Sequence, residues 1–481
     1  MRPSTTALAL IFAWLSLATS AHPGENPAGG VPPDYPFYPS LLQWISSKTS
    51  FTPPDVCGSC HRREYEEWSS SAHALAWVDP IYQGELNRAT QAIGQDSRNC
   101  VGCHSPAGVV TEEIRGAGVA GLGAMARAGV SCDVCHSVSG VTHQQTPSRN
   151  PENASLVLAP GRDWPTGSVP VKRGPFRPYE DCGGGFHECV QSPLHLEAEL
   201  CASCHQSTHY RAHSPLGSTY QEWKGSPYAQ KGVQCQDCHM VANETFERVA
   251  DTLTRPKLEE YRHSFGGANF LLYGLAEASA RKAGDERLAA KLRAQRDSAV
   301  KRLQACAELD VSAVYQQGAL SEVRVRVKNT RAGHGLPTHL TNIRQLWLEV
   351  IATDRSGTVL MASGQLLEDG ELEPGARLLG TEGRDESSRP AVDPWAVRSL
   401  PRVDSIPAKG FRDFHFGVPF PKSGEQVTVK VRLRYRQASP RLAREILGSL
   451  PGDIDLKAAY GLEGPPELPV VDMAVRKEVF P

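Results

Sequence analysis

One five-residue pattern, Cys-x-x-Cys-His, occurs five times in the first half of this 481-residue chain. The copies end at His61, His104, His136, His205 and His239. Two thiols at this spacing can add across the two vinyl groups of a porphyrin, and the histidine that follows can bind the iron. A zinc site or a redox dithiol also uses Cys-x-x-Cys, but neither needs a histidine directly after every pair. The sequence therefore predicts five covalently attached haems c, with these histidines as proximal iron ligands. The attachment cysteines are Cys57, Cys60, Cys100, Cys103, Cys132, Cys135, Cys201, Cys204, Cys235 and Cys238.

The N-terminus has the pattern of a secretory signal peptide. Arg2 precedes an apolar run over residues 7–17, and small residues follow at 18–21. We expect residues 1–21 to be cleaved and the protein to work in the periplasm or another exported compartment, where c-type haem is attached. No later stretch approaches the ~20 apolar residues that span a bilayer, so we expect no transmembrane segment after cleavage.

The charge balance excludes one class of partner. The chain has 51 Lys and Arg against 53 Asp and Glu, a formal net charge of −2. Nucleic-acid binding proteins carry a basic excess, which is missing from this composition. We therefore expect redox proteins, rather than nucleic acid, as partners.

The N-terminal part of the mature chain divides into an arm and a haem region. Residues 22–56 are rich in Pro, Gly and aromatics and lack periodicity, which indicates an extended arm. Residues 57–269 contain all five motifs, too few residues per motif for a separate globular unit around each haem. We expect a mainly α pentahaem cytochrome domain with little regular structure, cored by the haems themselves.

The rest of the chain changes from helical to strand periodicity. Residues 270–310 are rich in Ala, Leu, Lys, Arg and Glu at helical spacing, and Gly284 is the expected break. Within residues 311–481, the stretches 323–327, 346–351 and 427–435 alternate at the strand period. We expect a C-terminal antiparallel β-sandwich domain with long loops, residues 381–406 among them.

The haem region contains a degenerate internal repeat. Residues 65–73, which begin Tyr-Glu-Glu-Trp, align without gaps to residues 220–228, and residues 129–138 align to residues 232–241. The repeat predicts two related modules, the first with an additional haem at Cys100. It also places Tyr228 where the first module has His73.

Eleven histidines outside the motifs could be distal iron ligands, and two histidines per iron suit electron transfer. His73 follows His61 by twelve residues, and across a helix over residues 62–72 the two would be ~18 Å apart. His73 must then bind the iron of another haem. His263 and His334 lie among turn-forming residues that let an imidazole project from a constrained loop.

The remaining histidines cannot be ordered well from sequence. His143 and His195 are favoured because each lies close to a haem motif, and His187, His209 and His213 compete with them. His339 and His415 are interpreted as structural or exposed.

Four further residues outside the motifs carry an interpretation. Cys182 and Cys189 are too widely spaced for the haem pattern, and a disulfide that closes a Gly-rich loop around His187 is the favoured reading. Cys306 reads as a small buried residue. Tyr228 either packs in the interior or stands beside an iron that has no distal ligand, with its hydroxyl able to bond a substrate oxygen.

Residues 57–269 resemble the multihaem cytochromes of the cytochrome c-554 and hydroxylamine oxidoreductase group. The resemblance rests on Tyr65-x-x-Trp68-x-x-Ser-x-His73, on the Gly-Val-x-Cys-Gln-Asp-Cys-His-Met run that ends at Met240, and on His263-Ser-Phe-Gly-Gly267. It extends to Asn329-Thr-x-Ala-Gly-His334-Gly-x-Pro-Thr, at the start of a β-domain like those of exported multihaem cytochromes. The resemblance implies electron transfer through stacked haem pairs, with His73, His263 and His334 as distal ligands. The chain departs from the group in two ways. No motif ends in the Lys of pentahaem nitrite reductases, and the eight haems of the oxidoreductase are absent.

Two functions follow, with a weaker third. The first is an exported electron carrier with mostly bis-histidine haems and no catalytic residue. The alternative is a multihaem oxidoreductase that acts on a small nitrogen or sulfur compound at one iron with an open position. The third is a binding module in which the β-domain docks the cytochrome onto a partner.

Overall fold

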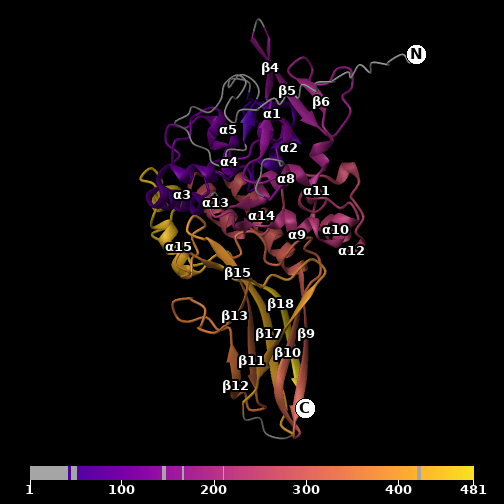
Figure 1. Ribbon diagram of the computed structural model, residues 1–481, viewed down its shortest axis with the longest axis vertical. Coiled ribbons are helices and arrows are strands. Elements are labelled where there is room, and N and C mark those ends of the chain that lie inside the picture. The colour runs from indigo at the N-terminus through magenta and orange to yellow at the C-terminus, as the bar shows by residue number, and fades with distance from the viewer. Residues whose placement is uncertain (1–41, 45–50, 143–147, 165–166, 210, 420–423) are drawn as a thin grey trace, which may run out of the picture.

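The computed structural model describes residues 42–44, 51–142, 148–164, 167–209, 211–419 and 424–481. The expected signal peptide, most of the expected arm and His143 lie outside these residues. The molecule is elongated, with the five motifs in a helical region at one end and long strands at the other (Figure 1). No helix in the described part of the chain is long and apolar enough to cross a bilayer.

Each haem motif lies on or against one short helix. These helices are α1 (Pro54–Cys60), α4 (Val101–His104), α7 (Cys132–His136), α8 (Ala198–His205) and α11 (Cys235–His239). Two cysteines three residues apart on a helix face the same side, as two thioether bonds to one porphyrin require. His61 is the C-cap residue of α1, and Cys100 is the N-cap residue of α4.

Short helices and turns connect the motifs. They are α2 (Arg62–Trp68), α3 (Pro80–Ile93), η2 (Gly94–Cys100), α5 (Pro106–Val110), α6 (Ala124–Arg127), η4 (Pro193–Leu196), α9 (Thr219–Lys224), α10 (Pro227–Gln230), α12 (Asn243–Thr252) and η5 (Leu258–Glu260). The helix expected over residues 62–72 ends at Trp68, so that expectation was too long. The cause is the serine run that follows, because the Ser71 hydroxyl accepts a hydrogen bond from the backbone N–H of Ala74 and so competes with helical pairing.

The haem region contains more strand than expected. Strands β1 (Gln43–Trp44), β2 (Val138–Val141) and β3 (Leu156–Leu158) form a sheet in the order β1-β3-β2. Strands β4 (Gly161–Trp164), β5 (Gly167–Gly174) and β6 (Glu188–Gln191) form a second sheet, whose β4–β5 hairpin projects beyond the helices in Figure 1. Strands β7 (Ser207–Thr208) and β8 (Pro215–Gly217) form a third.

Two helices separate the haem region from the long strands. Helix α13 (Phe270–Lys282) and helix α14 (Glu286–Ala305) meet at Gly284, whose φ of +78° suits glycine, so the expected break is confirmed. The helical segment is shorter than residues 270–310, because β9 already begins at Ala307.

Two antiparallel sheets form the C-terminal part. The first contains β9 (Ala307–Gln316), β10 (Ala319–Asn329) and β16 (Phe411–Gly417), in the order β16-β10-β9. The second contains β11 (Gln345–Thr353), β12 (Val359–Ser363), β17 (Val427–Arg436) and β18 (Val471–Phe480), in the order β12-β11-β17-β18, with β13 (Arg377–Leu379) also paired to β11. The three expected strands are confirmed within β10, β11 and β17. The loop expected over residues 381–406 instead contains the paired strands β14 (Thr381–Arg384) and β15 (Ser399–Val403).

Inward side chains from both sheets share one hydrophobic core. Alternate residues of β10, such as Val323 and Val325, and of β17, such as Val429 and Val431, are fully buried in it. The second face of these two strands is more exposed, as expected for antiparallel sheets with one solvated side.

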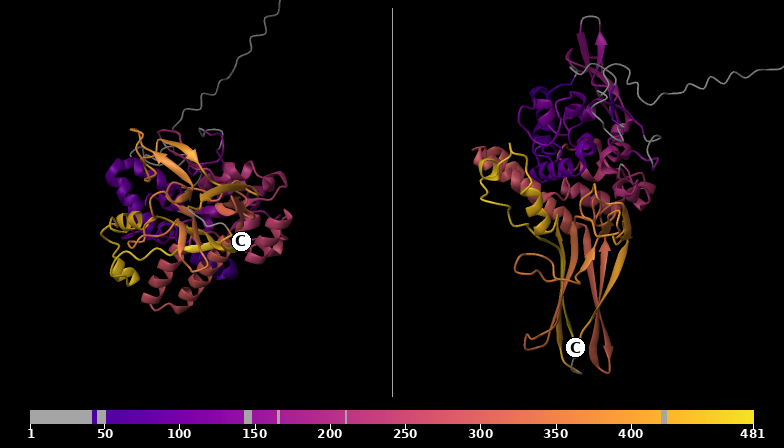
Figure 2. Two further views of the ribbon diagram at one scale, coloured as in Figure 1. Left: turned by 90° about the horizontal axis from the view of Figure 1, so that it is seen from below. Right: turned by 60° about the vertical axis from the view of Figure 1, so that its left-hand side comes forward.

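The segment between β17 and β18 folds back onto the haem region (Figure 2). Helix α15 (Pro440–Leu447) packs against α3 so closely that a Cβ on Gly84 would lie 2.2 Å from the carbonyl oxygen of Ile446. Between α15 and α16 (Leu456–Tyr460), the Asp453 carboxylate accepts hydrogen bonds from the backbone N–H groups of Val119 and Ala120 at 2.6 Å. The haem region and the C-terminal part are thus in direct contact.

Candidate functional site

The haem motifs lie against one another. In the first module, the thiol of Cys57 contacts that of Cys132, and in the second module Cys201 contacts Cys235. A further thiol contact, between Cys103 and Cys204, joins the additional motif of the first module to the second. Cys135 of the third motif also lies near Cys201 of the fourth, so the five porphyrin attachment points gather in one continuous cluster.

Equivalent hydrogen bonds confirm the internal repeat. The indole N–H of Trp68 donates to the carbonyl oxygen of Val130, and that of Trp223 donates to Val233, both at 2.9 Å. The backbone N–H of each valine donates in turn to the carbonyl oxygen of His73 or of Tyr228, both at 3.0 Å. His73 and Tyr228 thus occupy equivalent positions in the two modules, as the alignment predicted.

Three motif histidines are oriented by a backbone carbonyl. The Nδ1 atom of His104 lies 3.1 Å from the carbonyl oxygen of Ala76, and those of His136 and His239 lie 2.6 Å from the carbonyl oxygens of Arg173 and Gly266. A histidine that donates from Nδ1 keeps Nε2 unprotonated and free to bind a metal. These three rings are therefore held in the tautomer that an axial iron ligand needs.

Four motif-to-loop imidazole pairs have nearly the same spacing. Two imidazoles that bind one metal from opposite sides, each through a bond of about 2 Å, have ring centres roughly 6 Å apart. The observed ring-centre distances are 6.1 Å for His73 and His205, 6.3 Å for His136 and His263, 6.3 Å for His205 and His339, and 6.2 Å for His239 and His334. The donor set and its spacing fit an iron held between two imidazoles.

Burial keeps these imidazoles neutral. Desolvation lowers the pKa of His73, His239 and His339 to about 3 and that of His104 to about 4, and it also lowers the pKa values of His136, His205 and His263. A neutral imidazole is the form that coordinates metal. The buried Nδ1 atoms of His73 and His339 have no hydrogen-bond partner among the described residues, an unusual state for interior polar atoms.

Comparisons with known proteins agree with this chemistry. Residues 56–137 match the family model of cytochrome c554 and c-prime. The fold matches the crystal structure of a penta-haem cytochrome c552 from Thermochromatium tepidum with a TM-score of 0.57 and 18% identity, over 89% of this chain and 99% of that one. The chain is a multihaem c-type cytochrome that resembles the cytochrome c554 group. Its cofactor is haem c and its general role is electron transfer. No curated relative matches the chain.

His339 of this cytochrome was missed as a candidate ligand. The sequence suggested a structural or exposed residue, but His339 is half-buried and faces His205. Its loop packs so tightly on the haem region that a Cβ on Gly217 would lie 2.1 Å from the His339 Nδ1 atom. The one available signal was proximity, because His339 follows His334 by five residues in the same Gly/Pro-containing loop.

His195 has a different ring spacing and different hydrogen bonding from the four imidazole pairs. Its ring stacks on His136 with centres 5.6 Å apart, and its Nε2 atom lies 3.0 Å from the carbonyl oxygen of Cys135. Its Nδ1 atom is buried without a partner in the described part of the chain. Burial lowers the pKa of His195 to about 4. If His195 binds iron, Nδ1 is the nitrogen available for it.

The other competing histidines have no such surroundings. His209 uses both ring nitrogens, since Nε2 lies 3.0 Å from the carbonyl oxygen of Trp395 and Nδ1 accepts from backbone N–H groups. His213 is exposed, and His415 is exposed beside Glu322, as expected for His415. His61 is exposed, and no second imidazole is in ring contact with it among the residues that the structure describes.

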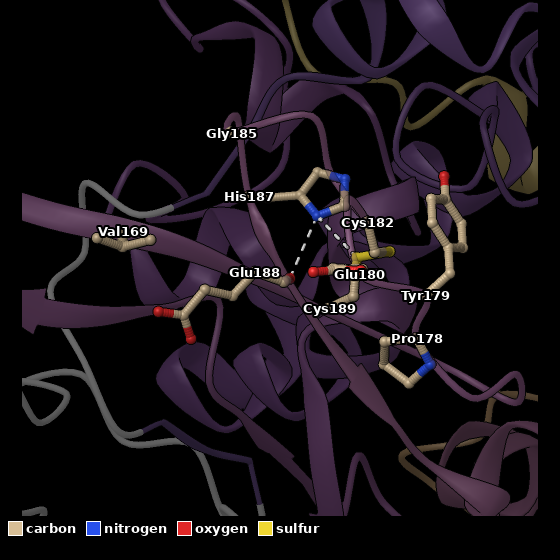
Figure 3. Close-up of a pocket in the computed structure, with 9 residues that line it drawn as sticks. All are labelled: Val169, Pro178, Tyr179, Glu180, Cys182, Gly185, His187, Glu188 and Cys189. Carbon is tan, nitrogen blue, oxygen red and sulfur yellow. Dashed lines mark hydrogen bonds between the residues drawn. A yellow bond between two sulfur atoms is a disulfide. The ribbon is translucent and has the colours of Figure 1, made fainter.

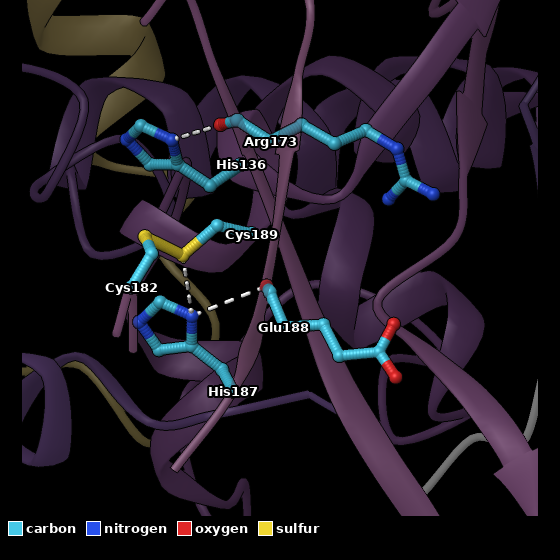
Figure 4. Close-up of a disulfide and its surroundings, with 6 residues drawn as sticks. All are labelled: His136, Arg173, Cys182, His187, Glu188 and Cys189. Carbon is cyan, nitrogen blue, oxygen red and sulfur yellow. Dashed lines mark hydrogen bonds between the residues drawn. A yellow bond between two sulfur atoms is a disulfide. The ribbon is translucent and has the colours of Figure 1, made fainter. Parts of the chain in front are cut away.

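The expected disulfide between Cys182 and Cys189 of the cytochrome is confirmed. His187 lies within the closed loop, with Nδ1 3.2 Å from the carbonyl oxygen of Glu188 and 3.6 Å from the Cys189 sulfur. The loop lines a pocket of about 410 Å³, which the rings of His187 and Tyr179 border (Figure 3). In the ladder between β5 and β6, Cys189 lies opposite Lys172. The next residue of β5 is Arg173, whose carbonyl oxygen is the hydrogen-bond partner of His136 (Figure 4). The loop is therefore attached to the third haem motif through β5.

Tyr228 packs in the interior. It is 1% exposed, and its hydroxyl lies 3.2 Å from the carbonyl oxygens of Ala250 and Arg331. The hydroxyl is thus engaged by the backbone, which favours the packing interpretation over a substrate-binding one.

Proposed function

We propose that this protein is a pentahaem electron carrier in which most irons are held between two histidines. The observation that carries the proposal is the set of four imidazole pairs spaced 6.1 to 6.3 Å apart. A haem held in this way supplies one-electron storage, with the iron alternating between ferric and ferrous states. The ten motif cysteines would hold the haems, and the five motif histidines would be their proximal ligands.

The distal ligands follow from the pairs. His334 would serve the haem of His239, and His263 would serve the haem of His136. His73 and His339 both face His205, and one iron takes only one distal ligand. His104 lies near both His73 and His339, so we assign this pair to the irons of His205 and His104, one to each. His195 and His143 remain the candidates for the haem of His61.

The thiol contacts support a short electron path. The second-module motif at Cys201 touches the motif at Cys235, and its Cys204 touches Cys103 of the additional motif. Cys201 also lies near Cys135 of the third motif. The fourth haem would therefore adjoin three others, with the first haem reached through the third.

The proposal extends to domain organisation and location. Residues 57–269 would form a haem-cored cytochrome domain, the helices that end at Ala305 a connection, and the chain from Ala307 onward a β-sandwich made of the two sheets that share one core. After cleavage of residues 1–21, and with residues 22–56 as an arm, the protein would act in the periplasm or another exported compartment. The Cys182 to Cys189 disulfide supports this location, since such bonds persist where the surroundings are oxidising.

A second function rests on His61. Its exposed ring is in contact with no other imidazole among the described residues, which makes the first iron a candidate for an open position. An open position there would allow an oxidoreductase acting on a small nitrogen or sulfur compound.

Two measurements on the matured protein test these functions. Intact-mass spectrometry should show five haem additions, and fewer would defeat the pentahaem proposal. Electron paramagnetic resonance of the oxidised protein should show only low-spin iron for a carrier. A high-spin signal from about one iron in five, with carbon monoxide binding to the same fraction, would favour the enzyme.

A further inference from the structure

One buried arginine of helix α14, Arg302, contacts the haem region. Arg302 is 6% exposed, and its guanidinium lies 4.8 Å from the ring centre of Phe246. Its N–H groups donate to the carbonyl oxygen of Cys238 at 2.7 Å, the carbonyl oxygen of Val241 at 2.5 Å and the amide oxygen of Asn243 at 2.8 Å. The first of these partners is the second attachment cysteine of the fifth haem.

The positive charge of Arg302 has no carboxylate partner in the described part of the chain. Its neighbours on α14 do: Arg293 and Arg296 pair with Glu277, and Arg287 pairs with Glu66. Within the described ranges, no Asp or Glu oxygen lies within ion-pair distance of Arg302. Arginine stays protonated in proteins even where burial disfavours the charge. A buried, uncompensated charge costs stability, so its position calls for a reason.

Gly266 makes the room that the guanidinium occupies. A Cβ at this position would lie 2.6 Å from the Cζ and Nε atoms of Arg302. The carbonyl oxygen of Gly266 is also the partner of the His239 Nδ1 atom. Arg302 therefore touches the fifth motif twice, at its cysteine carbonyl and at the residue that orients its proximal histidine.

We propose that Arg302 is a positioning residue that holds a fixed positive charge beside the fifth haem and raises the reduction potential of that haem. This inference rests on the proposed function, since it requires a haem at His239. Reduction by an external one-electron donor converts ferric to ferrous iron and adds one negative charge to the site. A nearby positive charge in a medium of low dielectric constant stabilises the reduced form over the oxidised form.

Three variants separate the charge from the hydrogen bonds. Arg302→Gln removes the charge and keeps polar contacts. Asn243→Asp keeps the arginine but places a carboxylate at its Nε atom, so that the two charges cancel with little change of shape. Arg302→Lys keeps the charge and loses the planar fork. Arg293→Gln, on the exposed side of the same helix, is the matched control.

The readout is a spectroelectrochemical titration of all five haems, after haem counting by mass. We expect the reduction potential of one haem to fall by ~59 mV in Arg302→Gln and in Asn243→Asp. For one electron, a shift of this size changes the ratio of oxidised to reduced haem about tenfold. Arg302→Lys should leave the potential of this haem close to the wild-type value. Arg293→Gln should leave all five haem potentials unchanged.

A purely structural role would give another result. Arg302→Lys and Arg302→Gln would then both lower the thermal midpoint of unfolding. The ratio of oxidised to reduced form would change less than twofold for every haem, and this result would overturn the inference. If Arg302→Gln fails to mature, Asn243→Asp alone decides between the two results. A wild-type haem count below five would instead defeat the proposed function, so the two failures are distinguishable.

Discussion

The Nδ1 atom of His239 lies 2.6 Å from the carbonyl oxygen of Gly266, and the backbone N–H of Gly266 donates back to the carbonyl oxygen of His239 at 2.8 Å. This two-way contact joins the fifth motif helix to Gly266, 27 residues further along the chain, in the loop that carries His263. The same glycine lies against Arg302. The fifth motif and helix α14 therefore both pack against one residue without a side chain.

Gly266→Ala should destabilise the protein, because the new methyl group must displace a buried guanidinium. We expect a loss of roughly 1 to 3 kcal/mol in the free energy of unfolding, as for other overpacked sites. Thermal unfolding followed by the visible haem band measures it. Gly267→Ala is the matched control, since a Cβ there meets no atom within 4 Å. Equal effects of the two substitutions would contradict this account of Gly266.

His334→Ala should open one iron. Its ring stands 6.2 Å from that of His239, with Nδ1 2.9 Å from the carbonyl oxygen of Gly335, so Nε2 is free for a metal. We expect about one haem in five to become high-spin and to bind carbon monoxide. His415→Ala, at an exposed position, should leave the spectra unchanged. An unaltered spectrum in the His334 variant would exclude this residue as a ligand.

Trp68→Phe and Trp223→Phe test the equivalence of the two modules. Each removes an indole N–H and leaves the carbonyl oxygen of Val130 or Val233 without its partner. We expect each to cost about 1 to 3 kcal/mol. Because the two bonds share no residue, the double variant should lose the sum of the two. Strong non-additivity in thermal or denaturant unfolding would show that the modules do not act independently.

Asp79→Asn should stabilise the protein at neutral pH. Burial raises the pKa of Asp79 from 3.8 to about 6. The folded protein therefore holds this proton at pH values where the unfolded chain has lost it, and the contribution of Asp79 to stability falls as the pH rises from about 4 to 6. Asparagine keeps the helix cap that Asp79 supplies to Ile81 but carries no charge. We expect a gain of roughly 1 to 2 kcal/mol at pH 7 and none at pH 3.5.

The control for this pH dependence is Asp455→Asn, at the exposed start of α16. It makes the same change of side chain without removing a buried carboxylate. Thermal midpoints of the wild type and both variants between pH 3.5 and 7 provide the comparison. A gain in the Asp79 variant that does not vary with pH would contradict the assigned cause.

Replacing Cys182 and Cys189 with serine should loosen the loop between β5 and β6. Closing a loop of this length contributes about 2 kcal/mol in the chain-entropy description. Phe176, Tyr179 and Phe186 are 62%, 73% and 58% exposed, so the opened loop should be cut by chymotrypsin. The wild type treated with a thiol reductant should be cut at the same places. Resistance in both cases would mean that other contacts hold the loop.

The amino-acid sequence alone predicts the haem attachment and the proximal ligands, because both depend on neighbours within five residues on one helical turn. Strand periodicity likewise located β10, β11 and β17, and Gly284 located the break between α13 and α14. The repeat could be aligned because each module conserves its own local hydrogen bonds, such as that from Trp68 to Val130.

Only the tertiary structure decided which imidazoles face one another. His73 faces His205, and His334 and His339 reach the haem region from a loop beyond β10. Such pairs bring together residues roughly a hundred positions apart, and no local periodicity encodes them. The structure also decided the charge around the fifth motif, since Arg302 reads in the sequence as one more basic residue of a helix. Its burial follows from the packing of α14 against α11 and α12, which a single helix cannot reveal.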